Sequence, residues 1–199
     1  MKHFQKLLQF QEFLRDYNKI YRDLESIHTT KLPDNDVEHS FRVAMLAWML
    51  VEEFKLKLNV KKILQYALVH DLVEIYAGDI SIYKNYKQAD KEKKEHASLQ
   101  KIKKKFPGLK SIWKLIESYE LRKDKESRFV YIIEKLEPIF LVITSANDHW
   151  TKRGISYDIF LELKQKKIKH IDSYAQIFNK ETMAYLKKHH KRFFIALYR

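Results

Sequence analysis

The segment YALVHDLVEIYAGD, residues 66–79, carries three ionisable side chains, His70, Asp71 and Glu74, inside an otherwise apolar stretch. On a helix of 3.6 residues per turn, Glu74 lies about 40° from His70 and about 60° from Asp71, so all three share one face. Apolar residues occupy the other faces, which predicts burial. Because burying charged groups without partners is costly, we expect a cation or a tight polar network at this face.

A second buried histidine is predicted in VEHSFRVAMLAWML, where His39 lies 31 residues before His70. From Val43 to Val51 the sequence is apolar on every side, which indicates a central helix. A histidine, a His-Asp pair and a later acidic residue form a mixed nitrogen and oxygen donor set that suits a divalent metal. For any one of these residues alone, a hydrogen-bonded core position is the simpler interpretation.

The composition favours one helical domain over residues 1–199, because only three glycines and three prolines leave few turns. The absence of cysteine excludes disulfides, thiolate catalysis and cysteine-based zinc sites. The N-terminal residues show no signal-peptide pattern, and no apolar run approaches the roughly 18 residues needed to span a membrane. We therefore expect a soluble cytoplasmic protein with no membrane partner.

The net charge of +13 is concentrated toward the C-terminus, where residues 151–199 hold twelve Lys and Arg against four Asp and Glu. Such a field favours phosphate-bearing ligands or nucleic acid. The competing interpretation is a solvated lysine-rich surface, and we favour it for most of these lysines. We expect no specific nucleic-acid binding.

The hydrophobic pattern has helical period along nearly the whole chain, which predicts an all-α fold. The predicted helices cover residues 3–25, 37–54, 60–77, 90–106, 109–121, 126–146, 156–169 and 173–197. Connections are predicted at residues 28–36, 80–88 and 147–154. Local residue types refine these bounds. Asp34 or Asp36 is a candidate N-cap of the second helix, Gly78 is predicted to end the third, and Pro138 is predicted to kink the helix over residues 126–146.

Three stretches together resemble the HD-domain phosphohydrolases, and most of all their 5′-deoxynucleotidase branch and its bacterial relatives. They are VEHSFRVAMLA, ALVHDLVEIYAGDI and RFVYIIEKLEP, and the likeness runs from about Arg22 to the C-terminus, including NDHWTKRGISYD at residues 147–158. The resemblance implies a single-domain HD-type helical bundle with a core region of about residues 22–150 and C-terminal helices, residues 156–197, packed on it. It also implies a homodimer that hydrolyses nucleoside 5′-monophosphates, with a preference for the 2′-deoxy sugar.

Position by position, the resemblance implies that His39, His70 and Asp71 are metal ligands. The last ligand of the family is normally an aspartate, and the matching residue here is Glu134 in IIEKLEP. Glutamate is one methylene longer, but both side chains offer a carboxylate. We expect Glu134 to be a working ligand of one divalent ion, whose identity among Mn, Co, Fe, Zn, Ni, Cu and Mg the sequence leaves open.

The remaining matches concern water and substrate. The resemblance implies that Glu74 acts on the attacking water, that Asp79 lies near the sugar and that Arg22 contacts the phosphate. The match at Arg22 lacks the usual Arg-x-x-Trp pattern, because Glu25 stands where an aromatic residue is common.

Other functions compete with this interpretation. A ppGpp hydrolase is a second HD-type candidate. In that branch an acidic pair follows HDxx, whereas the residues at those two positions here are Glu74 and Ile75, and only the first is acidic. Cyclic-dinucleotide phosphodiesterases carry a Gly-Lys pair after HD that this chain lacks. A binding protein with a degenerate site is the candidate from another class, and metal content would separate it from the enzymes.

Overall fold

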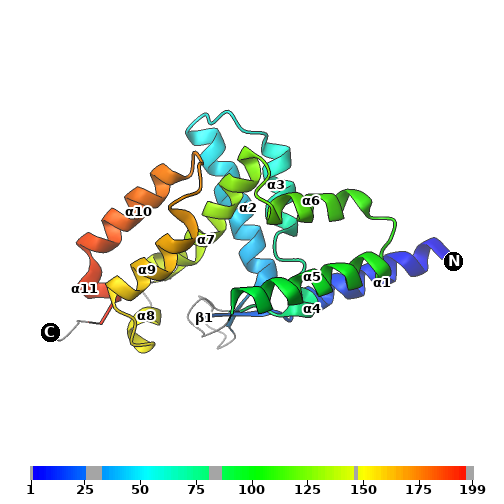
Figure 1. Ribbon diagram of the computed structural model, residues 1–199, viewed down its shortest axis with the longest axis horizontal. Coiled ribbons are helices and arrows are strands. Elements are labelled where there is room, and N and C mark those ends of the chain that lie inside the picture. Colours follow the sequence, from blue (N-terminus) through cyan, green and yellow to red (C-terminus); the bar gives the residue numbers. More distant parts are fainter. Residues whose placement is uncertain (1, 26–32, 81–86, 146–147, 196–199) are drawn as a thin grey trace.

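The computed structural model describes residues 2–25, 33–80, 87–145 and 148–195. Helix α2 (Asp36–Glu53), helix α3 (Val60–Val69) and helix α7 (Lys125–Ser145) pack against one another at the centre of the molecule (Figure 1). Their facing side chains, such as Val43, Ile63 and Phe129, are fully buried. The central position predicted for the second helix is therefore confirmed.

Helix α2 begins differently from the prediction. The capping side chain is that of Asn35, which accepts hydrogen bonds from the backbone N–H groups of Val37 and Glu38 at 3.1 Å each. Asp34 and Asp36, the predicted caps, are instead buried and face arginine side chains. The prediction was wrong because these carboxylates have tertiary partners that the local pattern does not reveal.

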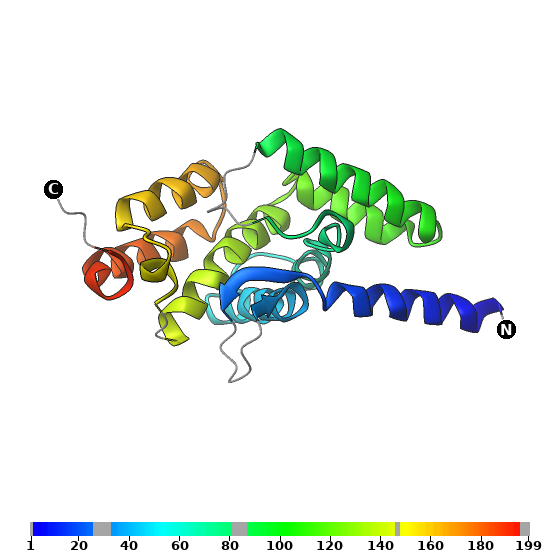
Figure 2. The same cartoon turned by 90° about the horizontal axis from the view of Figure 1, so that it is seen from below.

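The N-terminal helix is shorter than predicted. Helix α1 (Lys2–Tyr17) extends away from the body of the molecule (Figure 2), and strand β1 (Tyr21–Glu25) then pairs antiparallel with strand β2 (Pro33–Asn35). The predicted helix over residues 3–25 is therefore wrong beyond Tyr17. Tertiary pairing with β2 outweighs the helical periodicity there.

The predicted helix over residues 60–77 is also interrupted. Helix α3 ends at Val69, a tight turn follows, and the short helix α4 (Glu74–Ala77) ends at Gly78 as predicted. Gly78 has φ +77°, and its N–H donates to the carbonyl of Glu74 at 2.7 Å. A side chain at this position would be strained, which explains the glycine.

Helix α5 (Gln88–Lys105) and helix α6 (Lys110–Glu120) lie on one side of the central helices, close to their predicted bounds (Figure 1). With α1 and α4 they enclose a second apolar cluster, which contains Phe13, Leu72, Val73, Leu99, Ile102, Trp113 and Ile116. Most of the predicted loop at residues 80–88 lies outside the described residues.

The C-terminal helices lie on the other side of α7 (Figure 1). They are α8 (His149–Lys152), α9 (Tyr157–Ile168), α10 (Gln176–Lys188) and α11 (His190–Phe193). The connection predicted at residues 147–154 thus contains a short helix. The predicted helix over residues 173–197 is divided at His189, and its last two residues lie outside the described part.

The predicted all-α fold class is confirmed, with the short β1–β2 pair as its addition. In the described part of the chain, no helix combines the length and apolar character needed to cross a membrane. The assignment of residues 1–199 to one domain stays a prediction.

Candidate metal centre

The His-Asp pair lies in the tight turn between α3 and α4. His70 directly follows α3 and keeps helical backbone angles, and the N–H of Glu74 donates to the carbonyl of Asp71 at 2.8 Å. His70 Nε2 lies 3.1 Å from Asp71 Oδ2. The turn brings these donor atoms together, whereas the sequence predicted that they share the face of one continuous helix.

His39 reaches the same point from the first turns of α2. Its Nε2 lies 3.8 Å from Asp71 Oδ2, and its Nδ1 lies 2.6 Å from Glu137 Oε2 on α7. Glu137 in turn accepts a hydrogen bond from the guanidinium of Arg42. Donor atoms of His39, His70 and Asp71 all lie within 4.8 Å of one another, so the structure brings together the three predicted ligands.

The hydrogen bonds define the tautomers of both histidines. His70 Nδ1 lies 2.8 Å from the carbonyl of Ala67, which can only accept, so Nδ1 carries the proton and Nε2 a lone pair. The carboxylate of Glu137 orients His39 in the same way. Both Nε2 atoms are buried, with no hydrogen-bond partner among the described residues. Two converging imidazole lone pairs beside a carboxylate fit a divalent metal.

Carboxylates crowd the other side of this point. Donor atoms of Asp36, Asp71 and Glu74 also lie within 4.8 Å of one another. Burial and the charge of Asp71 raise the pKa of Asp36 to about 8 and the pKa of Glu74 well above its usual range. Burial, reinforced by the charge of Arg22, lowers the pKa of His39 to about 4, so its imidazole is neutral at pH 7. A neutral imidazole and mutually repelling carboxylates both favour a bound cation.

Arg22 on β1 belongs to the same cluster. Its Nη1 donates to Asp36 Oδ1 at 3.2 Å and to Asp71 Oδ2 at 3.3 Å. The side chain therefore lies beside the predicted ligands although its segment is a strand and not the predicted helix. Its contact with a phosphate stays a prediction.

Glu134 lies on α7 and is buried, but its carboxylate is outside both groups of close donor atoms. Its Oε1 accepts a hydrogen bond from the hydroxyl of Tyr119 at 3.2 Å and lies 2.8 Å from Lys135 Nζ. Glu134 and His70 line the same pocket. The predicted role of Glu134 as a metal ligand stays a prediction.

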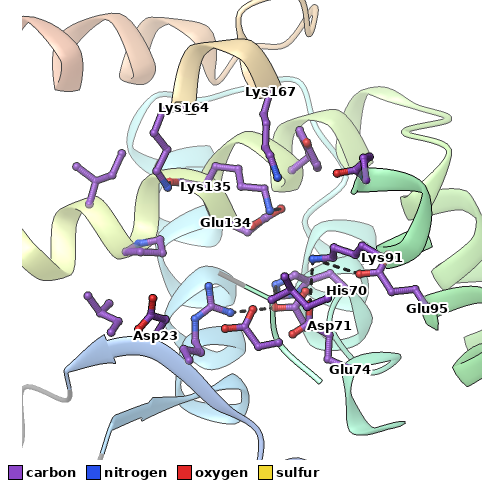
Figure 3. Close-up of a pocket in the computed structure, with 18 of the residues that line it drawn as sticks. Asp23, His70, Asp71, Glu74, Lys91, Glu95, Glu134, Lys135, Lys164 and Lys167 are labelled. Atoms are coloured by element: carbon purple, nitrogen blue, oxygen red, sulfur yellow. Dashed lines mark hydrogen bonds and ion pairs between the residues drawn. The ribbon is translucent and has the colours of Figure 1, made fainter. Parts of the chain in front are cut away.

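The pocket beside the centre encloses about 180 Å³. Figure 3 shows His70, Asp71 and Glu74 on its lower wall and several lysines around and above them. Asp79 also lines the pocket, and its place near the sugar of a substrate stays a prediction. Because ligand sites for drug-sized molecules usually occupy about 300–1,000 Å³, the enclosed part suits a small group such as phosphate.

Several residues of the site were missed by the sequence analysis. Glu137 supports His39, and Asp36 joins the carboxylate cluster. The sequence did contain a signal for Glu137, which lies one helical turn after Glu134 in a largely apolar stretch. Other pocket residues that were missed are Lys91, Tyr119, Lys135, Lys164 and Lys167.

The two glutamates of α6, Glu117 and Glu120, have different surroundings. Glu120 lines the pocket, and burial together with the charge of Glu95 raises its pKa to about 7. Glu117 is not among the residues that line the pocket, and it pairs with Lys103. Of the two, Glu120 is therefore the one that belongs to the neighbourhood of the site.

A family model described as HD domain matches residues 18–175. The chain is 31% identical over 135 residues to the 5′-deoxynucleotidase HDDC2 of Xenopus laevis, covering 67% of this chain and 66% of that protein. It is 27% identical over 135 residues to the human HDDC2 protein, covering 67% of this chain and 65% of that protein. The chain thus spans just under two thirds of the length of these relatives.

A solved structure, that of a predicted metal-dependent phosphohydrolase from Magnetospirillum magnetotacticum, superimposes with a TM-score of 0.69. The two chains are 22% identical, and the match covers 96% of each. At this level of identity the comparison supports the arrangement of the helices.

Proposed function

Because the chain belongs to the HD-domain family, we propose that it is a metal-dependent phosphohydrolase that releases phosphate from nucleoside 5′-monophosphates and prefers the 2′-deoxy sugar. The observation that carries this proposal is the pair of buried Nε2 atoms of His39 and His70, which converge on Asp71 without hydrogen-bond partners among the described residues. The names of the curated relatives support the substrate class.

His39, His70 and Asp71 would hold the metal, with Glu134 as a further ligand. Glu137 and the carbonyl of Ala67 orient the two imidazoles. When bound, a divalent cation supplies Lewis-acid chemistry to the phosphoryl group and makes the attacking water more acidic.

Glu74 is the residue that we propose to take the proton from the attacking water. Its Oε2 is buried without a hydrogen-bond partner among the described residues, and its Oε1 lies 3.4 Å from Lys91 Nζ. Burial and the charge of Asp71 raise its pKa well above the usual range, which makes the carboxylate a stronger base toward the water.

Arg22 and Asp79 are proposed to bind the substrate. Arg22 presents a guanidinium beside Asp71, where it can neutralise charge that develops on the phosphoryl oxygens. Asp79 follows Gly78 at the pocket wall and offers a carboxylate to the hydroxyls of the sugar. Both roles rest on the family resemblance and on the positions of these residues around the pocket.

The test is a phosphatase screen. The protein is stripped with EDTA, reconstituted separately with Mn, Co, Fe, Zn, Ni, Cu or Mg, and assayed against ribo- and deoxynucleoside 5′-monophosphates. We expect Mn or Co to restore phosphate release, because mixed imidazole and carboxylate donors suit these ions. Stoichiometric metal binding without turnover of any monophosphate would point to a binding protein and contradict the proposal.

The Glu74→Gln variant tests the proton-transfer role. We expect turnover to fall by roughly a hundredfold or more, the usual size of a general acid–base contribution, while metal content stays close to that of the wild type. His70→Ala is the matched comparison, because it should lose the metal. If Glu74→Gln loses the metal to the same degree, Glu74 is a ligand and the assigned role is wrong.

We further propose that the protein is a homodimer. Helix α2 exposes an apolar stripe made of Phe41, Met45, Trp48 and Met49, all more than 40% exposed. Contiguous apolar surfaces of this kind mark interaction sites, and pairing of identical surfaces about a twofold axis is the commonest arrangement. Light scattering should give twice the chain mass, and Met45→Lys should give a monomer. A monomeric wild type would contradict the proposal.

Two expectations about the protein's surroundings stay proposals. We propose a cytoplasmic location, which fractionation of cells expressing the protein would test. We also propose that oligonucleotide binding is weak and falls steeply with salt, because only counterion release from the basic surface would drive it. Tight sequence-selective binding at physiological salt would contradict this expectation.

A further inference from the structure

Lys164 lies on the inward face of α9, where packing alone would favour an apolar residue. It follows Phe160 and precedes Ile168 by one helical turn each, and both of these neighbours are fully buried. Lys164 itself is only 8% exposed. Because burial of an ammonium group is costly, a lysine at this position calls for an explanation other than packing.

The polar contacts of Lys164 leave its charge uncompensated. Its Nζ donates to the backbone carbonyl of Lys135 at 3.1 Å, and within the described part of the chain it forms no ion pair with a carboxylate. Two other lysines of the pocket differ in this respect. Lys135 pairs with Glu134 at 2.8 Å, and Lys91 pairs with Glu74 at 3.4 Å.

Lys164 and Lys167 form the wall of the pocket opposite the candidate metal centre. Figure 3 shows both side chains reaching down from α9, with His70, Asp71 and Glu74 below and Lys135 between the two walls. The pocket therefore has a cationic wall from the C-terminal helices facing the imidazoles and carboxylates of the centre. An anionic group in the pocket would lie between this cationic wall and the candidate metal centre.

Electrostatics support an anion at this place. Burial and, after it, the charge of Lys135 lower the pKa of Lys164 to about 7, and Glu134 opposes this effect only in part. The charges of Arg22 and Lys167 act in the same direction as that of Lys135. A doubly charged phosphate would relieve this repulsion and provide acceptors for the ammonium protons.

We propose that Lys164 binds the phosphate group of the substrate from the C-terminal wall, with Lys167 contributing positive charge beside it. The inference deepens the proposed function, on which it rests for the chemical class of the ligand. It assigns a substrate contact to α9, a helix in which the sequence analysis placed no site residue.

The test measures binding of inorganic phosphate by calorimetry to the full chain in EDTA, so that no metal contributes. Lys164→Met keeps the length and volume of the side chain but removes the charge, and Lys166→Met is the matched control on the exposed side of α9. We expect phosphate affinity to fall roughly tenfold to a hundredfold in Lys164→Met, the size of a charge-assisted hydrogen bond. It should stay unchanged in Lys166→Met, and Lys164→Arg should retain most of it.

Several results would overturn the inference. They are wild-type phosphate affinity in Lys164→Met, an equal loss in Lys166→Met, or no phosphate binding by the metal-free wild type. A purely structural role of Lys164 would appear as a lower unfolding midpoint in Lys164→Met with phosphate binding preserved.

The inference and the proposed function fail in different ways. If the reconstituted wild type hydrolyses monophosphates and Lys164→Met has the same kcat/KM, only the inference is wrong. If Lys164 governs phosphate affinity but no monophosphate is hydrolysed, the phosphate-binding role of Lys164 stands and the proposed function is wrong.

Discussion

At the scale of single residues, His39 and His70 each use Nδ1 to bind an acceptor that the fold holds in place. For His70 the acceptor is the carbonyl of Ala67 within its own helix, whereas for His39 it is a side chain on another helix, Glu137. An outer carboxylate both orients a metal-binding imidazole and increases its basicity. Both histidines therefore present Nε2 to a metal, but they depend on different partners.

The Glu137→Gln variant should weaken metal binding without removing a predicted ligand. The amide keeps the shape of the carboxylate but loses the charge that His39 and Arg42 share. We expect metal affinity, measured by competition with a chelator, to fall roughly tenfold to a hundredfold. Glu126→Gln is the control, because Glu126 is a buried carboxylate of the same helix that accepts from Asn59 N at 3.1 Å. Equal losses in both variants would show that the effect is not specific to the centre.

Glu134 requires a comparison of two substitutions. If Glu134 binds the metal in place of the family's aspartate, Glu134→Ala should lower metal affinity by roughly tenfold or more. Loss of a direct ligand should cost at least as much affinity as loss of a residue that only orients a ligand. Glu134→Asp should keep most of the affinity because a carboxylate remains. The competing outcome is that Glu134 serves only Tyr119 and Lys135, its partners in the structure. Equal metal content in the wild type and Glu134→Ala would establish that outcome.

The sequence predicted the candidate metal ligands better than the residues that orient them or line the pocket beside them. His39, His70 and Asp71 were found because they interrupt apolar runs in a specific pattern. Glu137 was missed because its partner His39 lies 98 residues away, and no local periodicity encodes such a contact. Lys164 was missed for a related reason, since its helix reaches the pocket only through tertiary packing.

At the scale of elements, the two main errors concern where helices end. The apolar pattern continues through Leu72 and Val73, which are buried in the turn between α3 and α4 as they would be in a helix. Periodicity reports burial and therefore does not distinguish a buried turn from a buried helix. At β1, pairing with β2 supplies the hydrogen bonds that a continued helix would otherwise have made.

The Gly78→Ala variant tests how much the backbone conformation at the end of α4 contributes to stability. Its φ of +77° with ψ of 151° belongs to a region almost restricted to glycine, so Gly78→Ala should lower the free energy of unfolding by about 1–3 kcal/mol. Among the described residues other than Gly78 and its two chain neighbours, no atom lies within 4 Å of an added Cβ, so we expect backbone strain to cause this loss. Gly108→Ala is the control, because it has equal space and no positive φ. Urea unfolding of both variants gives the comparison, and equal stability would contradict the strain argument.

At the scale of the whole molecule, the C-terminal helices line a pocket whose metal-binding candidates lie in the central helices and in the turn after α3. Trp150 of α8 and Lys164 of α9 line the same pocket as His70. Trp150 also stacks on Phe194 at a ring separation of 4.8 Å, which connects the pocket wall to the core of the C-terminal helices. The stability of these helices and the shape of the pocket should therefore be coupled.

Burial of His149 should make the stability of the folded protein depend on pH. It is buried on α8, and Arg153 Nη1 donates to its Nδ1 at 2.9 Å, which requires a lone pair on that nitrogen. Burial, reinforced by the charge of Arg153, lowers its pKa from 6.5 to about 4. Between these values the unfolded chain binds a proton at this position that the folded chain excludes.

The stability contributed by neutral His149 should therefore be complete above pH 6.5 and be lost as the pH falls through about 4. Buried carboxylates such as Asp34 and Asp36, whose pKa values are raised, act in the opposite direction, so the wild type alone does not isolate the effect. The His149→Gln variant keeps an acceptor for Arg153 and cannot be protonated. In EDTA, the unfolding free energy of the wild type relative to this variant should fall by about 2 kcal/mol between about pH 7.5 and about pH 4.5. A difference that does not change with pH would show that His149 keeps an ordinary pKa in the folded protein.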